Sequence, residues 1–103
     1  MARQVVWSYT ATADLEAIAD YIARDSSFYA AVFVREILEA SRSLSEFSER
    51  GRVVPELGNQ SIRELLVREY RLVYTIKESN VVILGLIHGK RDLKMLWEKE
   101  KQG

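Results

Sequence analysis

The side chains that could bind or act on an anion lie in the second half of this sequence, within or directly after apolar runs of strand character. They are four cations and the only histidine: Arg63, Arg71, His88, Lys90 and Arg91. An arginine inside a strand costs solvation energy unless it faces water or meets an anion. Several cations near one end of a sheet therefore predict a surface for an anionic partner, such as a phosphate backbone or an acidic peptide. The alternative is that these arginines are solvated or paired with nearby carboxylates, at Glu64, Glu69 and Asp92.

Metal-free RNA cleavage is the catalytic chemistry that these residue types could support. It needs a base to activate the ribose 2′-hydroxyl, cations to stabilise the pentacoordinate phosphate, and an acid for the leaving oxygen. Arg71 and Arg91 could supply the cations, and His88 or Lys90 could act as acid or base. Trp97 could stack on an RNA base, although packing against the core is the commoner role of such a residue.

The composition argues against several other kinds of chemistry. With one histidine and no cysteine, the chain has no zinc constellation of the usual kind. No Ser-His-Asp arrangement can be argued from spacing, and no glycine-rich loop opens a helix as phosphate binding requires. We therefore expect neither a metal nor a cofactor.

A length of 103 residues predicts one domain, spanning 1–103. The longest apolar run, at 81–87, is too short to cross a bilayer, and the first residues do not resemble a signal peptide, so we expect no membrane partner. The absence of cysteine fits a reducing cytoplasm, where we expect the protein. The net charge is zero, but residues 1–50 carry five Lys/Arg and eight Asp/Glu, whereas 51–103 carry ten and seven. A polyanion should therefore dock on the second half.

Apolar periodicity predicts one strand, two helices and then three strands. The expected elements are a strand at 3–8, helices at 11–24 and 28–46, a loop at 47–60, and strands at 61–67, 70–77 and 80–88. Thr10 is the expected N-cap of the first helix, and a last short helix is expected to begin at Asp92. The fold class is therefore α+β, with a helical hairpin packed on a four-stranded, mainly antiparallel sheet. The expected core residues are Leu15, Ile18, Ile22, Phe33, Ile37, Leu72, Tyr74 and Ile83.

Several short motifs follow one another in an order that resembles a known family. Tyr70–Tyr74 reads Tyr-Arg-Leu-Val-Tyr, an apolar strand follows it, and His88–Arg91 reads His-Gly-Lys-Arg. The helical-hairpin pattern from Trp7 to Ile37, and the pairs Gly51-Arg52 and Pro55-Glu56 in the following loop, agree with the same family. Together these features resemble the RelE/ParE superfamily of bacterial toxins from type II toxin–antitoxin pairs, over nearly the whole chain. The resemblance implies a cognate antitoxin, encoded by the adjacent gene, as a partner.

The chain resembles the ParE branch of this superfamily more than the ribonuclease branch. Ribonuclease members carry an aromatic residue with a hydroxyl in the final segment, and lysines before the central arginine. Here the corresponding aromatic is Trp97, which has no hydroxyl, and the strand before Arg71 holds no lysine. The motif Ile62–Leu65 also resembles ParE. ParE members bind DNA gyrase and trap it on cleaved DNA, which would make this chain a gyrase inhibitor rather than an enzyme.

Two alternatives to gyrase binding stay open. One is a RelE-like, ribosome-dependent mRNA endonuclease, whose candidate catalytic residues are Arg71, Arg91, His88, Lys90 and Trp97. The other is an inactive interaction domain. For gyrase, the expected target-binding residues are Arg63, Arg71, His88, Lys90, Arg91 and Trp97. We expect Arg71 and Arg91 to be functional cations, so that alanine at either position leaves the melting temperature nearly unchanged and weakens toxicity.

Overall fold

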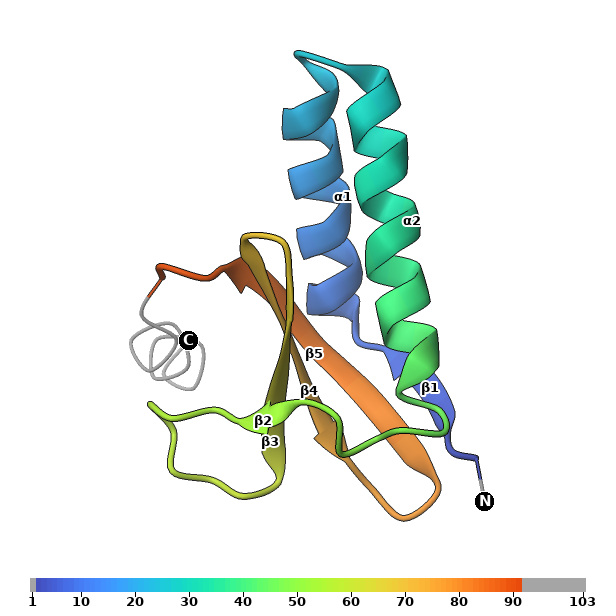
Figure 1. The fold of residues 1–103 in the computed structure, drawn as a ribbon, viewed down its shortest axis with the longest axis vertical. Coiled ribbons are helices and arrows are strands. Elements are labelled where there is room, and N and C mark those ends of the chain that lie inside the picture. Colours follow the sequence, from blue (N-terminus) through green and yellow to red (C-terminus); the bar gives the residue numbers. More distant parts are fainter. Residues whose placement is uncertain (1, 92–103) are drawn as a thin grey trace.

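The computed structural model of the protein describes residues 2–91. In chain order it contains a strand, two helices and four further strands (Figure 1). These elements are β1 (Gln4–Trp7), α1 (Tyr9–Ala23), α2 (Ser27–Ser43), β2 (Arg52–Val53), β3 (Ile62–Val67), β4 (Tyr70–Ile76) and β5 (Asn80–His88). The short helix expected from Asp92 lies outside the described residues.

Serine side chains cap the N termini of both helices. Ser8 caps α1, and its hydroxyl accepts a hydrogen bond of 3.0 Å from the Ala11 amide. The prediction of Thr10 as this cap was wrong, because the strand runs directly into the helix: the Ser8 amide still donates to the Ile83 carbonyl of β5, at 2.9 Å. Ser26, which lies between the two predicted helices, caps α2 by accepting a hydrogen bond from the amide three residues later, at 3.1 Å.

Both helices are close to their predicted lengths. α1 covers 9–23 instead of 11–24, and α2 covers 27–43 instead of 28–46. α2 ends before residue 46 because the helical hydrogen-bond pattern changes at Leu44, whose amide donates to the Ser41 carbonyl three residues earlier, at 3.1 Å. Within the part of the chain that the structure describes, neither helix is long and apolar enough to cross a membrane.

The strands form one sheet in the order β1-β5-β4-β3-β2. β1 pairs in parallel with β5, and every other pair is antiparallel. The prediction of four strands missed β2, which pairs Arg52 with Glu64 and Val53 with Arg63 along the outer edge of β3. Two residues are too few to show the strand period, so this segment was predicted as part of a loop.

The helical hairpin covers one face of the sheet, and the main apolar core lies between the two layers (Figure 1). Five of the expected core residues are buried there: Phe33, Ile37, Leu72, Tyr74 and Ile83. The expected core residues of α1 pack against this cluster but are only partly buried: Leu15, Ile18 and Ile22. Partial burial fits the position of α1, since the far end of the hairpin extends past the sheet (Figure 1).

The other face of the sheet carries a smaller apolar cluster. It consists of Val54, Ile62 and Val73, with Leu57, Leu84 and Ile87 packed against them. Val54 and Leu57 come from the segment after β2, so this segment folds back over the sheet to bury them. Glu56 lies between them in sequence and is thereby brought to the same face as the side chains of β4.

A β-bulge in β5 is held by a carboxylate from α1. Val73 pairs with Gly85 and Tyr74 with Ile83, so one residue of β5 is left without a partner at this point. The Leu86 amide beside the bulge donates to Oδ2 of Asp14 at 3.0 Å. Burial raises the pKa of the Asp14 carboxyl, and the hydrogen bond from Leu86 partly opposes that shift.

The raised pKa of Asp14 predicts that the ionised carboxylate weakens the fold as pH increases. A carboxyl whose pKa is higher in the folded state stabilises it fully below the unfolded pKa, near 3.8, and loses that contribution as pH rises through the folded pKa. Asp14→Asn keeps an oxygen acceptor for Leu86 but cannot ionise. We expect the free energy of unfolding of the variant to increase relative to that of the wild type as pH rises above the unfolded pKa near 3.8, measured by chemical denaturation. A difference that is constant with pH, or that grows in the opposite direction, would contradict this role.

Candidate functional site

A hollow of about 440 Å³ lies at one end of β3, β4 and β5. It is lined by Arg52, Leu66, Arg68, Glu69, Arg71, His88, Gly89 and Lys90. The antiparallel register creates this arrangement, because Arg71 of β4 pairs with Leu66 of β3 on one side and with Ile87 of β5 on the other. The structure therefore brings together Arg71, His88 and Lys90, three of the residues that the sequence pattern singled out.

Of the other predicted residues, Arg63 and Arg91 lie outside this lining. Arg63 is directed toward the segment before β2, where its Nη1 donates to the Gly51 carbonyl at 2.7 Å. Arg91 comes directly after the hollow in sequence, and its amide donates to the His88 carbonyl at 3.0 Å while its side chain is exposed. Trp97 is not among the residues that the structure describes.

Arg71 is 4% exposed, and each of its three guanidinium nitrogens contacts an oxygen of the protein. Nε donates to Oε1 of Glu64 at 2.6 Å, and Nη2 lies 2.6 Å from the same oxygen. Nη1 and Nη2 donate to the two carboxylate oxygens of Glu56, at 2.8 and 2.7 Å. Nη1 also donates to the Arg91 carbonyl at 3.2 Å. Glu56 and then Glu64 raise the pKa of the Arg71 guanidinium, although burial opposes the shift, so the group stays charged.

Glu64 is 1% exposed and binds a second arginine. Nε of Arg52 donates to Oε2 of Glu64 at 2.7 Å, from the neighbouring strand β2. We call Arg52, Glu56, Glu64 and Arg71 the ion cluster. Its formal charges cancel, and every member contacts a group of opposite charge. A buried carboxylate is costly unless it is paired in this way, so the cluster contributes to the fold.

The position of Arg71 favours one of the two interpretations that the sequence left open. Its guanidinium is directed at carboxylates of the same chain, and not at solvent. The geometry therefore favours a structural role for Arg71 in the fold. Glu64 was among the partners considered from the sequence. Glu56 was not, because it lies in a loop whose path depends on the burial of Val54 and Leu57.

His88 makes weaker contacts at the edge of the hollow. Its Nδ1 accepts a hydrogen bond from the Lys90 amide at 3.2 Å, and its Nε2 lies 3.8 Å from Oε2 of Glu69. Its ring also meets the ring of Tyr70 edge-on, with 5.5 Å between centroids. Between residues 2 and 91 there is no group of three or more His, Asp or Glu side chains that could hold a metal ion.

Among residues 2–91, Lys90 and Arg91 are the exposed cations at this end of the sheet that form no ion pair. Arg68, on the same hollow, is already paired with α2, where its Nη2 donates to Oε1 of Glu36 at 2.8 Å. Neither Lys90 nor Arg91 forms an ion pair with another described side chain. The positive charge that this surface can offer to a partner therefore comes mainly from the segment after β5.

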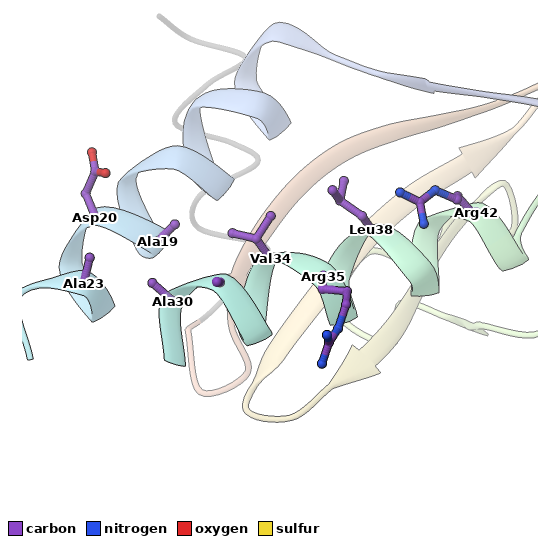
Figure 2. Close-up of a pocket in the computed structure, with 9 residues that line it drawn as sticks. Ala19, Asp20, Ala23, Ala30, Val34, Arg35, Leu38 and Arg42 are labelled. Atoms are coloured by element: carbon purple, nitrogen blue, oxygen red, sulfur yellow. The ribbon is translucent and has the colours of Figure 1, made fainter. Parts of the chain in front are cut away.

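A second concave surface lies between the two helices of the hairpin, and its lining consists of residues that the sequence pattern did not single out. This hairpin groove, of about 480 Å³, is lined by Ala19, Asp20, Ala23, Ala30, Ala31, Val34, Arg35, Leu38 and Arg42 (Figure 2). Alanines form much of its surface, and Val34 and Leu38 project from the same side of α2 (Figure 2). The spacing of these small residues outside the main apolar stripes is the sequence signal that could have revealed it.

The ion cluster predicts opposite outcomes for two arginines that the sequence treated alike. Arg71→Ala leaves Glu64 buried without its main cation, and we expect the free energy of unfolding to fall by about 3–5 kcal/mol. Arg91→Ala removes an exposed side chain and keeps the carbonyl that Arg71 binds, so we expect a change within about 0.5 kcal/mol. Urea denaturation of both variants measures the difference. Equal stability of the two variants would show that Arg71 does not support the fold.

Comparison with known proteins agrees with this architecture. Residues 5–93 match the family model described as the ParE toxin of the type II toxin–antitoxin system parDE. A relative from Caulobacter vibrioides, Toxin RelE2, is 38% identical over 89 residues, which cover 85% of this chain and 97% of the relative.

Two solved structures share the fold. One is from the chromosomal ParDE toxin–antitoxin system of P. aeruginosa, with a TM-score of 0.71 and 23% identity, covering 84% of this chain and 96% of that one. The other is from the toxin–antitoxin complex RelBE2 of Mycobacterium tuberculosis, with a TM-score of 0.63 and 23% identity, covering 85% of this chain and 99% of that one. The family match over residues 5–93 establishes that the chain belongs to the ParE toxin family of type II toxin–antitoxin systems, and the identity to Toxin RelE2 agrees with membership of the wider RelE/ParE superfamily.

Proposed function

We propose that this toxin acts in the cytoplasm by binding DNA gyrase and poisoning it on cleaved DNA. The observation that carries the proposal is the engagement of Arg71, whose guanidinium is bound by Glu56 and Glu64. A ribonuclease of this fold would need that central arginine to stabilise the charge that develops on the phosphate. A protein that binds a target needs only a shaped surface with complementary charge.

The chemistry of the hollow also supports binding more than RNA cleavage. His88 is the single histidine of the sequence, and its side chain already contacts Glu69 and the Lys90 amide. The ion cluster is neutral as a whole, which leaves little positive potential in the hollow for a polyanion. Among the described residues of this surface, the exposed cations that form no ion pair are Lys90 and Arg91, and a carboxylate on a protein target could pair with them.

A RelE-like, ribosome-dependent mRNA endonuclease is the alternative. It is favoured by the position of His88 and Lys90, which line the same hollow as Arg71 and could act as acid or base there. The C. vibrioides relative named RelE2 gives this alternative a second argument. The two candidates require different targets, so assays with purified components can separate them.

The gyrase proposal is tested with purified wild-type protein and one double variant. We expect the wild type to inhibit gyrase supercoiling and to stabilise gyrase-linked DNA breaks, with no effect on mRNA in a translation extract. Lys90→Ala combined with Arg91→Ala removes the two available cations, and we expect inhibition to weaken by about tenfold or more. Arg24→Ala, which removes an exposed arginine at the far end of α1, is the matched control. Codon-positioned cuts in mRNA, with gyrase unaffected, would overturn the proposal in favour of the endonuclease.

We further propose that the hairpin groove binds an amphipathic helix of a cognate antitoxin encoded by the adjacent gene. Structural neighbours of this chain come from toxin–antitoxin complexes, which supports such a partner. The small side chains of the groove allow a helix backbone to approach closely, and an apolar face can cover Val34 and Leu38. Arg35 and Arg42, which also line the groove, would attract acidic side chains on the flanks of that helix.

Filling the groove should weaken the complex. We expect co-expression with the adjacent gene product to give a stoichiometric complex that relieves growth arrest. Ala31→Trp places a large side chain in the groove at an exposed helical position, and we expect affinity for the antitoxin to fall by about tenfold or more. Ala17→Trp, on an exposed part of α1 outside the groove, is the control and should bind normally. Absence of any complex would exclude this antitoxin, whereas equal binding by both variants would place it elsewhere on the surface.

A further inference from the structure

Arg71 connects the ion cluster to the segment that carries the available cations. Its Nη1 donates to the Arg91 carbonyl at 3.2 Å, while the rest of the guanidinium is fixed by Glu56 and Glu64. Backbone hydrogen bonds hold the same segment at its start, since Gly89 donates to the Glu69 carbonyl at 2.7 Å. The contact with Arg71 also holds this segment at residue 91. The backbone is therefore fixed next to the side chains of Lys90 and Arg91.

We propose that Arg71 is a positioning residue, which orients Lys90 and Arg91 for contact with the target through the Arg91 carbonyl and does not itself touch the target. The inference rests on the proposed function, because it assigns Arg71 a part in that target-binding surface. It differs from the expectation drawn from the sequence, in which Arg71 was itself a target-binding cation.

The donor inventory of Arg71 supports an indirect role. A guanidinium has five N–H groups, and the structure gives this one five contacts between a nitrogen and a protein oxygen. A phosphate or carboxylate from a target would have to displace Glu56, Glu64 or the Arg91 carbonyl from it. Displacing Glu64 would leave a carboxylate that is 1% exposed without its main cation, which is strongly unfavourable.

The geometry also explains why such a residue would matter for binding. Lysine and arginine side chains are long, and ordering them at an interface costs conformational entropy. A backbone that is already fixed lowers that cost, because only the side-chain rotamers remain to be ordered. Arg71 can fix the backbone because its own rotamer is set by two carboxylates, and Arg52 in turn holds Glu64 in place.

The first test measures the segment itself, without any target. Arg71→Lys keeps the positive charge beside Glu64 but cannot reach all three acceptors with one planar fork. We expect the ¹⁵N relaxation of the amides of residues 89–91 to report increased mobility in this variant, while the other amides of β5 are unchanged. Arg24→Lys, at an exposed site on the helical hairpin, is the matched control. Unchanged relaxation of residues 89–91 in folded Arg71→Lys would overturn the proposal.

A second variant keeps the test decisive if Arg71→Lys does not fold. Arg71→Met combined with Glu56→Gln and Glu64→Gln removes the charges of the two carboxylates together with the arginine, so no buried charge is left unpaired. Replacing a buried ion pair by neutral groups of similar volume is often tolerated. The same increase in mobility at 89–91 is expected in this triple variant, and its absence would count against the proposal in the same way.

The second test asks whether Arg71 acts through the two cations. Growth arrest is titrated with inducer in a double-mutant cycle between Arg71→Lys and the pair Lys90→Ala and Arg91→Ala. We expect Arg71→Lys to weaken arrest by about tenfold in the wild-type background and to add little once the two cations are gone. If the fold-losses of toxicity in Arg71→Lys and in the Lys90/Arg91 pair multiply in the combined variant, Arg71 acts independently of the two cations. That result would overturn the proposal.

The outcomes separate this inference from the proposed function. Relaxation needs no target, and growth arrest reports toxicity whether the target is gyrase or the ribosome. A wild-type protein that arrests growth but leaves gyrase unaffected would overturn the gyrase proposal alone. If the wild-type protein causes no growth arrest, the proposal that it is toxic is wrong. The relaxation of residues 89–91 would then decide by itself whether Arg71 fixes the segment.

Discussion

The pairing of Glu64 with Arg71 is the interaction on which the face of the sheet away from the helices depends. Burying a carboxylate carries a desolvation cost that only a well-placed cation and hydrogen bonds can offset. Arg71 from β4 and Arg52 from β2 supply them from the two sides of β3, so the three strands are held to one register. Glu56 then binds the remaining side of Arg71 from a loop. These contacts also determine which charged groups are exposed in the hollow, because they bury the guanidinium of Arg71, its central cation.

Much of the fold could be predicted from the sequence because its signals are local. The helices follow from apolar spacing, and the strands of the β3–β5 meander follow from their alternation. The errors occurred where distant contacts decide the local structure. Ser8 became the helix cap because its amide pairs with β5, and β2 exists because Arg52 and Val53 find partners on β3. Neither contact leaves a periodic pattern in the sequence.

The candidate site was predictable in position but not in its internal pairing. Strand ends and turns place Arg71, His88 and Lys90 at one end of the sheet, and antiparallel pairing brings them together. Whether Arg71 is free depends on Glu56, and its loop is positioned by apolar side chains that pack on the far face of the sheet. The residues of the hairpin groove were not predicted for a different reason, since the spacing of small uncharged alanines is a weak signal beside the main apolar stripes.

The parallel pairing of β1 with β5 has a consequence for how the chain assembles. Gln4 pairs with Asn80, so β1 can join the sheet only after β5 has been synthesised. α1 and α2 are neighbours in sequence and can pack together much earlier, because local contacts form before distant ones. The hairpin groove can therefore be complete on a nascent chain whose hollow does not yet exist. A partner that recognises the groove would have a kinetic advantage, since it could bind during synthesis, before the sheet has closed.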